Sequence, residues 1–368
     1  MPVHPRRWPG RVPIGNSGSI TLIQEARAPR PRLSVTVLNY NYARYLPSCI
    51  ESILEQTFAD FELVIIDDCS TDDSEEILRK YAGDRRVRII RHESNRGYVA
   101  SLIEGAEANP ATELLTVVSA DDMVVDREAF ARQVAALDQT PAAAFCFSAY
   151  WTVDADGVVG VTVQAPLSDA EAVPGQKFLA YYLTRTGMHV LHTGAVIRRS
   201  AYERAGRYRP DLRYAVDFAM WGMLALEGDA VYRSAPLYGY RVHRGQMSKS
   251  LAGVKKTLRE VLSSIDAVFD KAGERQLALS VSRGQAIRFH LFSEALPDAF
   301  KGDRWMALRR VAAALSVRPL QALRSRALAE TILVVCFGTR GHGFVRSLVR
   351  SVPWLGAALL PTDLVANS

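Results

Sequence analysis

The sequence predicts an α/β protein with a mixed, mainly parallel sheet flanked by helices, followed by an α-helical C-terminal region. From Leu33 to Asp126, short β-branched runs alternate with segments of helical periodicity, a pattern typical of right-handed βαβ units. Polar side chains follow three of the predicted strands, at the sheet edge where α/β folds bind ligands. From about Ser250 the chain has helical periodicity and no clear strand.

The elements alternate in a regular order through the first part of the chain. Short apolar runs predict strands at residues 33–38, 61–67, 87–91 and 113–119. Apolar residues at helical spacing predict helices at residues 45–56, 74–82, 97–108 and 127–139. Beyond them we expect a strand at 143–153 and, among short strands from Gly194 to Arg241, one helix at 215–228.

We divide the chain into a flexible basic N-terminal tail (1–32), an α/β domain (33–249) and a helical C-terminal region (250–368). The hydrophobic content of 48% is ample for one large or two moderate cores. We expect a cytoplasmic protein without a transmembrane helix, because no apolar run approaches the ~20 residues that span a bilayer. The tail also lacks the apolar segment of a signal peptide. Four scattered cysteines without a C-x-x-C pair argue against a zinc cluster.

Positive charge is concentrated at the two ends of the chain. Residues 1–32 carry six arginines against one acid, and residues 301–350 carry ten Lys or Arg against two acids. Such segments can be solvated faces or can contact anionic partners. We do not expect nucleic-acid binding, because the basic residues lack interleaved aromatics and a known module. Trp305 and Leu308 within the second segment favour a peripheral contact with the anionic inner face of the cell membrane.

Two adjacent acids, Asp121 and Asp122, follow the predicted strand at 113–119. Adjacent carboxylates repel each other, so a positive group is expected beside them. The chain has neither the G-x-G-x-x-G nor the G-x-x-x-x-G-K-[ST] phosphate loop. A carboxylate-lined site can hold a diphosphate when Mg²⁺ or Mn²⁺ lies between them. The pair therefore predicts a divalent cation at the sheet edge.

A second acidic pair, Asp67 and Asp68, follows the strand at 61–67. The next acids, in the segment 71–73, fit local capping of the following helix. Asp67 and Asp68 precede that cap, so a ligand role is the better interpretation, and a carboxylate there can accept the imide N–H of uracil or thymine.

The first predicted strand is followed by "NYNYARYL". Tyr40 offers a ring on which a base can stack, and Asn41 offers a hydrogen-bonding partner. Tyrosine-rich turns are common, so this signal is weak without the acids of the neighbouring strands.

Two residues nearer the middle of the chain complete the candidates. Asp217 begins an apolar helix, where an acid either interacts with the helix dipole or, if partly buried above a metal, acts as a general base. His243 follows a strand-like run, where it is either structural or a third metal ligand beside acidic oxygens.

Taken in order, these motifs strongly resemble glycosyltransferase family 2, the inverting enzymes of the GT-A fold. They span about residues 33–248. The motifs are "SVTVLNYNYARYLPSCIESILEQTFADFELVIIDDCSTDDS", "NRGYVASLIEGA", "SADD", "HTGAVIRRSAYERAG" and "AVDFAMWGML…YGYRVHRGQMS".

The resemblance implies a nucleotide-sugar donor, usually a UDP or dTDP sugar. Tyr40 and Asp68 would hold its base, and Asp121 would face its ribose and phosphates. Asp122 would coordinate Mn²⁺ or Mg²⁺, with His243 as a further ligand.

The resemblance also assigns Asp217 as the catalytic base, which takes a proton from the acceptor hydroxyl as that oxygen attacks the anomeric carbon. We therefore expect an enzyme that transfers a sugar to a saccharide or lipid-linked acceptor at the cell surface. Specificity is expected in the loops after Asp126 and around His189 and His192. Ser119 and Val216 replace acids that are frequent in the family. These departures keep open a non-catalytic nucleotide-sugar binder or scaffold of an envelope glycan assembly.

Overall fold

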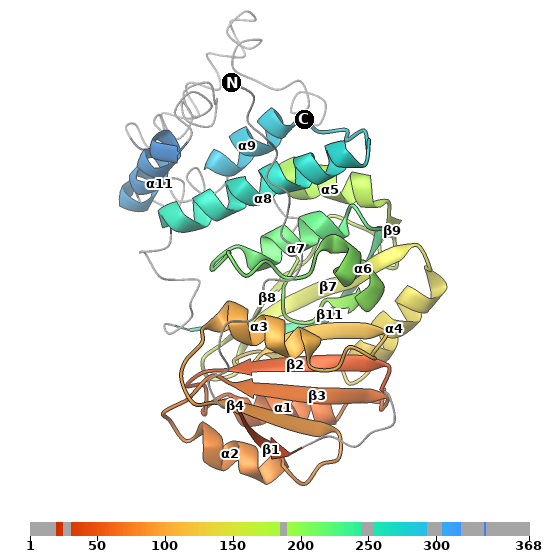
Figure 1. Cartoon of the computed structure of the whole chain (residues 1–368), viewed down its shortest axis with the longest axis vertical. Coiled ribbons are helices and arrows are strands. Elements are labelled where there is room, and N and C mark those ends of the chain that lie inside the picture. The colour runs from red at the N-terminus through yellow and green to blue at the C-terminus, as the bar shows by residue number, and fades with distance from the viewer. Residues whose placement is uncertain are drawn as a thin grey trace, which may run out of the picture.

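The computed structural model describes residues 20–24, 31–184, 190–243, 254–292 and 304–317, together with Val335. A twisted sheet carries helices on both faces, and further helices from the C-terminal part stack beyond one of these layers (Figure 1). The predicted mixed α/β architecture is confirmed.

The sheet is mixed, with a parallel core. Its central parallel strands lie in the order β4 (Val87–His92), β3 (Phe61–Asp67), β2 (Leu33–Asn39) and β5 (Leu114–Ser119). The sheet continues through antiparallel β10 (Val196–Arg198) to a second parallel pair, β7 (Ala143–Asp154) and β11 (Asp229–Val242). Shorter strands complete it: β1 (Ile20–Gln24), β6 (Met123–Val124), β8 (Val159–Val163) and β9 (Ala172–Val173).

The central strands are buried on both faces. All seven residues of β2 and of β3 are buried, as expected for parallel strands rich in aliphatic residues. Alternate side chains therefore enter two different cores. One core contains α1 (Leu46–Leu54), α2 (Ser74–Tyr81) and α4 (Ala129–Gln139). The other contains α3 (Tyr98–Glu107), α5 (Gly175–Thr184), α6 (Arg199–Ala205) and α7 (Val216–Leu224).

The C-terminal helices extend the second core. They are α8 (Val254–Glu274), α9 (Arg283–Phe292) and α11 (Arg304–Val317). Leu262, Ile265 and Val268 of α8 are buried in the same cluster as Trp221 of α7, and Figure 1 shows α8 lying along α7. The region after Ser250, as far as it is described, thus packs on the α/β part. Among the described helices, none has the length and apolar character needed to cross a bilayer.

Two parts of the chain differ from the sequence-based expectation. The predicted N-terminal tail contains strand β1, which pairs antiparallel with β4. Near the end of that tail, Arg32 forms ion pairs with Glu113, at 2.8 Å, and with Asp138. The segment from Gly194 to Arg241 holds two helices and the long strand β11 in place of one helix among short strands.

Gly194 offers a test of how tightly the sheet packs next to β10. Its φ is +83°, and an added Cβ would lie 2.2 Å from the ring of Tyr238. We expect Gly194→Ala to lower the free energy of unfolding by about 2–4 kcal/mol, because left-handed strain of about 1 kcal/mol adds to overpacking. Urea denaturation measures this loss.

Gly206 is the matched control. Its φ is +97°, but an added Cβ would meet no atom within 4 Å. Gly206→Ala should therefore cost only about 1 kcal/mol. Equal losses in the two variants would show that the Tyr238 ring is not the obstacle.

Candidate active site

The carboxyl ends of β3, β2 and β5 lie side by side, so both acidic pairs reach one edge of the sheet. Backbone hydrogen bonds continue the register past the strands, from Asp68 N–H to Asn39 O (2.9 Å) and from Ala120 N–H to Leu38 O (3.1 Å). Asp68 and Asp121 therefore emerge on either side of the turn that follows β2. This is the convergence expected from the sequence.

The turn after β2 is tied to the turn after β3. Asn41 has a left-handed φ of 58°, its N–H donates to Ser70 Oγ (2.9 Å), and its Oδ1 accepts from Thr71 N–H (2.8 Å). Asn41 was predicted to bind the donor, and in the structure its side chain is engaged by the neighbouring turn. Tyr40 beside it is 45% exposed, which leaves its ring available to a ligand.

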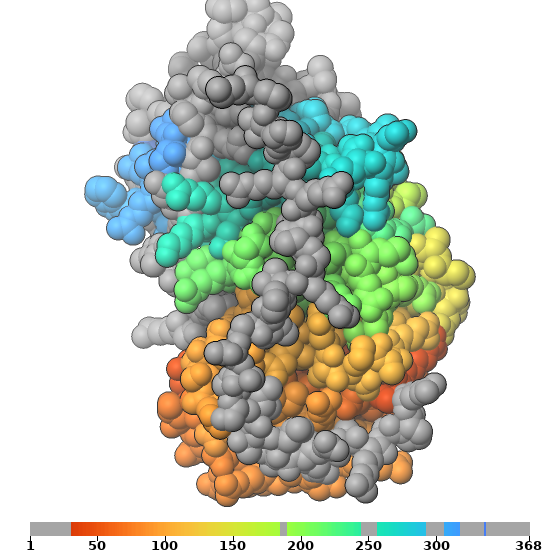
Figure 2. All heavy atoms as spheres, in the orientation of Figure 1, coloured from red at the N-terminus to blue at the C-terminus, as the bar shows by residue number. Residues whose placement is uncertain are grey.

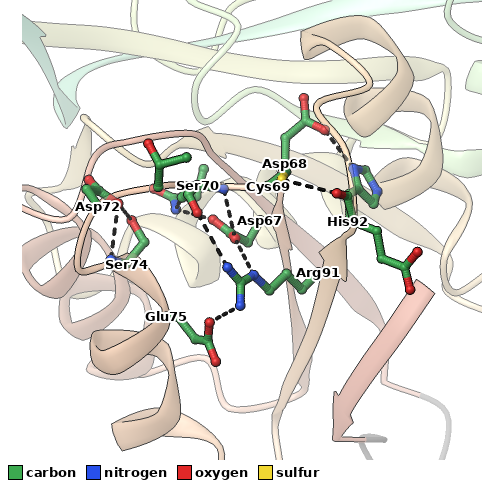
Figure 3. Close-up of polar contacts among 12 residues, drawn as sticks. Asp67, Asp68, Cys69, Ser70, Asp72, Ser74, Glu75, Arg91 and His92 are labelled. Carbon is green, nitrogen blue, oxygen red and sulfur yellow. Dashed lines mark hydrogen bonds and ion pairs between the residues drawn. The ribbon is translucent and has the colours of Figure 1, made fainter. Parts of the chain in front are cut away.

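The acids after β3 have different environments (Figure 3). Asp67 is fully buried, where it accepts hydrogen bonds from Asn39 Nδ2 (2.7 Å) and Ser70 N–H (3.3 Å) and pairs with Arg91 at 3.4 Å. These donors neutralise and hold its carboxylate. Asp67 therefore belongs to the framework of the site.

Asp68 points to the opposite side, beside His92. Its Oδ1 lies 2.7 Å from His92 Nδ1 and accepts from Arg96 N–H at 2.7 Å, and its Oδ2 accepts from Gly97 N–H at 2.8 Å. The carboxylate thus fixes the backbone directly before α3. A base-binding role for Asp68 stays a prediction. What the structure adds is that Asp68 also fixes the start of α3.

Asp122 is turned into the protein. It is buried, its Oδ2 accepts from Thr193 Oγ1 (2.5 Å), and its Oδ1 accepts from Arg241 N–H (2.8 Å). Burial and the neighbouring charge of Asp121 raise the pKa of Asp122, and these two donors oppose the shift. The repulsion expected within the pair is therefore present in the structure.

Arg241 supplies part of the positive charge that was expected beside Asp121 and Asp122. Its Nε donates to Asp121 O (2.8 Å), and its Nη1 donates to Asp154 O (2.9 Å). The guanidinium lies 4.7 Å from the ring centroid of Tyr45, within the range of a cation–π contact. The sequence-based prediction assigned no role to Arg241.

His243 meets Asp121. His243 Nε2 lies 3.0 Å from Asp121 Oδ2, and both side chains are less than 10% exposed. The rings of Tyr42 and Tyr45 pack on the imidazole at centroid distances of 5.7 and 5.1 Å. The sequence paired His243 with Asp122; the structure brings it to Asp121.

Asp121 and His243 offer carboxylate and imidazole atoms, which suit Mn²⁺ or Mg²⁺. Within the described residues no group of three or more His, Cys, Asp or Glu side chains is arranged for a metal. These two side chains would supply a divalent cation with one carboxylate and one imidazole ligand.

Asp217 lies in the first turn of α7, as predicted, and is partly buried. Its Oδ1 accepts from Phe218 N–H at 2.7 Å. Its negative charge contributes to raising the pKa of Tyr182 and of Tyr208, both already raised by burial. Asp217 therefore faces an aromatic environment, on the α5 and α7 side of the sheet.

A chain of three polar rings lies beside Asp217. Tyr98 Oη is 2.8 Å from His192 Nδ1, and His192 Nε2 is 2.9 Å from Tyr208 Oη. Burial lowers the pKa of His192, against the opposing charge of Asp217, which favours the neutral imidazole. Neutral imidazole has one donor and one acceptor nitrogen, so it can link the two hydroxyls.

Tyr98 connects the two halves of the site. Burial raises its pKa, and the charges of Asp217, Asp122 and Asp121 raise it further. The Tyr98 side chain is therefore within electrostatic reach of the base candidate and of the acidic pair. The electric fields of Asp217 and of the acidic pair thus both act on the Tyr98 hydroxyl.

Sequence reasoning gave no role to Tyr98, and it placed His192 only in a loop expected to set specificity. The available signals were weak. Tyr98 stands inside the quoted motif "NRGYVASLIEGA", and His192 opens "HTGAVIRRSAYERAG", but neither pattern reveals that the two side chains meet. His189, named with His192, lies outside the described residues.

Residues 34–206 match the family model described as "Glycosyl transferase family 2". The matched segment includes both acidic pairs and Tyr98, and it ends before Asp217 and His243.

Curated relatives match about a quarter of the chain. Glycosyltransferase GlyG of Streptococcus pneumoniae is 39% identical over 93 residues, which is 25% of this chain and 31% of that protein. A PGL/p-HBAD biosynthesis glycosyltransferase of Mycobacterium tuberculosis is 34% identical over 106 residues, 28% of this chain and 41% of that protein. The chain thus spans about a third of the length of the curated relatives that it matches.

Solved structures match the fold over most of the chain. The 1–349 portion of S. aureus TarS in complex with UDP-GlcNAc superposes with a TM-score of 0.58 at 16% sequence identity. The superposition covers 84% of this chain and 88% of TarS 1–349. The complex of the same TarS portion with UDP gives a TM-score of 0.57 at 17% identity. At these identities the likeness concerns the fold, which is of the GT-A type expected from the sequence.

Proposed function

Because residues 34–206 belong to glycosyltransferase family 2, we propose that this chain is a metal-dependent inverting glycosyltransferase. It moves a sugar from a nucleoside diphosphate, UDP or dTDP, to a hydroxyl of a saccharide or lipid-linked acceptor in cell-surface polysaccharide synthesis. The observation that carries the proposal is the place of residues 192–193 between the two sides of the site. Thr193 Oγ1 donates to Asp122 Oδ2 at 2.5 Å, and the His192 ring lies 6.0 Å from that of Trp221 in α7, the helix that carries Asp217. Donor and acceptor groups can therefore meet between these two sides.

The donor lies across the sheet edge. The exposed ring of Tyr40 offers a stacking surface for the base, and Asp68, the other predicted base-binding residue, lies at the end of the neighbouring strand β3. Asp121 and His243 would hold the divalent ion, and Asp122 and Arg241 fix the backbone behind them. The ion, when bound, stabilises the negative charge that develops on the leaving diphosphate.

Asp217 acts from the opposite side of the sugar. It accepts the proton of the acceptor hydroxyl while that oxygen forms its bond to the anomeric carbon, and the bond to the diphosphate breaks on the far side. Its Oδ1 accepts a hydrogen bond from Phe218 N–H at 2.7 Å, which orients the carboxylate at the start of α7. Tyr98 and His192, which meet at 2.8 Å, would line the same region with polar groups.

The alternative is a non-catalytic nucleotide-sugar binder or scaffold of an envelope glycan assembly. Val216 motivates it, since it leaves Asp217 without an acidic neighbour on its N-terminal side. Both functions require donor binding, so a binding measurement does not distinguish them. A measurement of donor turnover does distinguish them, because only the enzyme consumes the donor.

Asp121→Asn tests the metal-bridged donor site. We expect the affinity for UDP in the presence of Mn²⁺ to fall at least about tenfold, because changes around a metal ligand cost 10–100-fold. In EDTA the variant and the wild type should bind alike. Isothermal titration measures both conditions.

Asp156→Asn is the control, since this exposed acid pairs with Arg44 near the same edge, at 2.6 Å, without facing the acidic pair. It should leave affinity unchanged. Metal-independent UDP binding by the wild type, or full affinity in Asp121→Asn, would exclude the proposed ion site.

Asp217→Asn tests catalysis. We expect kcat for donor turnover to fall by about 10²–10⁴, the usual contribution of a general base, with UDP affinity unchanged. Release of UDP in a coupled assay measures kcat. Full activity in Asp217→Asn would rule out this residue as the base, and a wild type that binds donor but never turns it over would favour the scaffold.

We also propose that α11 contacts an anionic membrane surface. Trp305 is 79% exposed and Leu308 is 42% exposed, and they share a helical face with exposed Arg309. α11 lies at the surface of the molecule in Figure 2. Aromatic and aliphatic side chains beside a cation suit the interfacial layer of an anionic bilayer. Of the basic stretch 301–350, the structure describes residues 304–317 and Val335.

Vesicle flotation tests the membrane contact. The protein should float with vesicles containing phosphatidylserine at low salt and be released by salt, and Trp305→Ser should lower the bound fraction several-fold. Val161→Ser is the control, because Val161 is 67% exposed on the distant strand β8. No flotation of the wild type, or equal loss in both variants, would refute the contact.

A further inference from the structure

A carboxylate from the C-terminal helices holds the segment that leads into α7. Glu260 of α8 accepts hydrogen bonds at a single oxygen, Oε2, from the backbone N–H groups of three successive residues. The donors are Arg213 at 3.0 Å, Tyr214 at 2.7 Å and Ala215 at 3.0 Å. Asp217 follows two residues later.

These three bonds satisfy donors that the fold otherwise leaves unpaired. Ala215 is buried and Tyr214 is partly buried, and a buried N–H without a partner costs about 1–3 kcal/mol. A charged acceptor makes each bond stronger than a neutral one would. The backbone entering α7 is therefore fixed in place by Glu260.

Glu260 is itself held in α8, which packs on α7. Ile265 and Val268, one and two turns further along α8, are buried in the core that includes Trp221 of α7. Ser264 Oγ donates to Glu260 O at 2.7 Å. The carboxylate is thus attached to a helix whose place is set by the core.

We propose that Glu260 is a positioning residue for sugar transfer. It fixes the backbone at residues 213–215 and thereby the location of the Asp217 carboxylate relative to the acceptor hydroxyl. The proposal rests on the proposed function, in which Asp217 is the base. It makes α8, which lies beyond the segment 34–206 that matches the family, part of the catalytic unit.

The other end of α7 offers a matched contact with α8. Arg275 Nη2 pairs with Glu227 Oε1 at 2.6 Å, and Arg275 Nη1 donates to Leu226 O at 3.2 Å. These contacts join the residue that follows α8 to the segment that follows α7. Because a helix rises 1.5 Å per residue, they lie on the order of 15 Å from Asp217.

The experiment compares Glu260→Ala and Glu260→Gln with Arg275→Ala in the full chain. Donor KM, UDP affinity, kcat and amide hydrogen exchange at residues 213–215 are measured for each. We expect Glu260→Ala to lower kcat by about 100-fold, as a misplaced catalytic group does, and to speed the exchange of these amides. Glu260→Gln, which keeps a neutral oxygen, should show a smaller loss, and donor KM and UDP affinity should stay within about twofold.

Arg275→Ala distinguishes a specific effect on the position of Asp217 from a general weakening of the contact between α8 and α7. It should change kcat by less than about twofold even where it lowers stability as much as the Glu260 variants do. Equal losses of kcat in Arg275→Ala and the Glu260 variants would overturn the inference. So would unchanged kcat in Glu260→Gln with faster amide exchange. If Glu260→Ala does not fold, Glu260→Gln carries the same comparison.

The wild type and Asp217→Asn distinguish this inference from the proposed function. An inactive wild type, or a fully active Asp217→Asn, would sink the proposed function. An active wild type with an inactive Asp217→Asn and fully active Glu260 variants would overturn the positioning role alone.

Discussion

Hydrogen bonds from backbone N–H groups to carboxylates hold this site together. Asp68 accepts them from Arg96 and Gly97, and Asp122 accepts one from Arg241. Glu260 accepts three more before α7. Charge-assisted bonds of this kind are short and strong. Each of them ties a loop to an element far away in the sequence, so these acids form a framework for the site.

Within each acidic pair, the two carboxylates have different surroundings. Asp67 and Asp122 are turned inward, where side-chain and backbone donors satisfy them. Asp121 keeps its carboxylate against His243 at the edge. A carboxylate already committed to buried donors is poorly placed to bind a metal directly, whereas an acid and an imidazole at the edge can share one. The repulsion within the Asp121–Asp122 pair gives such an ion a favourable electrostatic environment.

Further hydrogen bonds lead from Asp68 to the polar rings beside Asp217. Asp68 fixes the backbone before Tyr98, Tyr98 bonds His192, and His192 bonds Tyr208. From the other direction, Glu260 fixes the start of the helix that carries Asp217. The start of the helix that carries Asp217 is thus held from the C-terminal helices, and α8 and α9 share a core with α5 and α7.

The sequence by itself determined the α/β class, the alternation of elements and the meeting of the acids at one edge. Those follow from local periodicity and from parallel topology, which brings strand ends together. Only the tertiary structure decided that His243 faces Asp121, 122 residues away, that Arg241 lies behind the pair, and that Glu260 holds the α7 start. A hydrogen bond between distant residues depends on angles and distances within an ångström, which no local pattern records. β11 was likewise misjudged as short strands, because Pro236 and the irregular register around it interrupt a strand that β7 nevertheless pairs along its length.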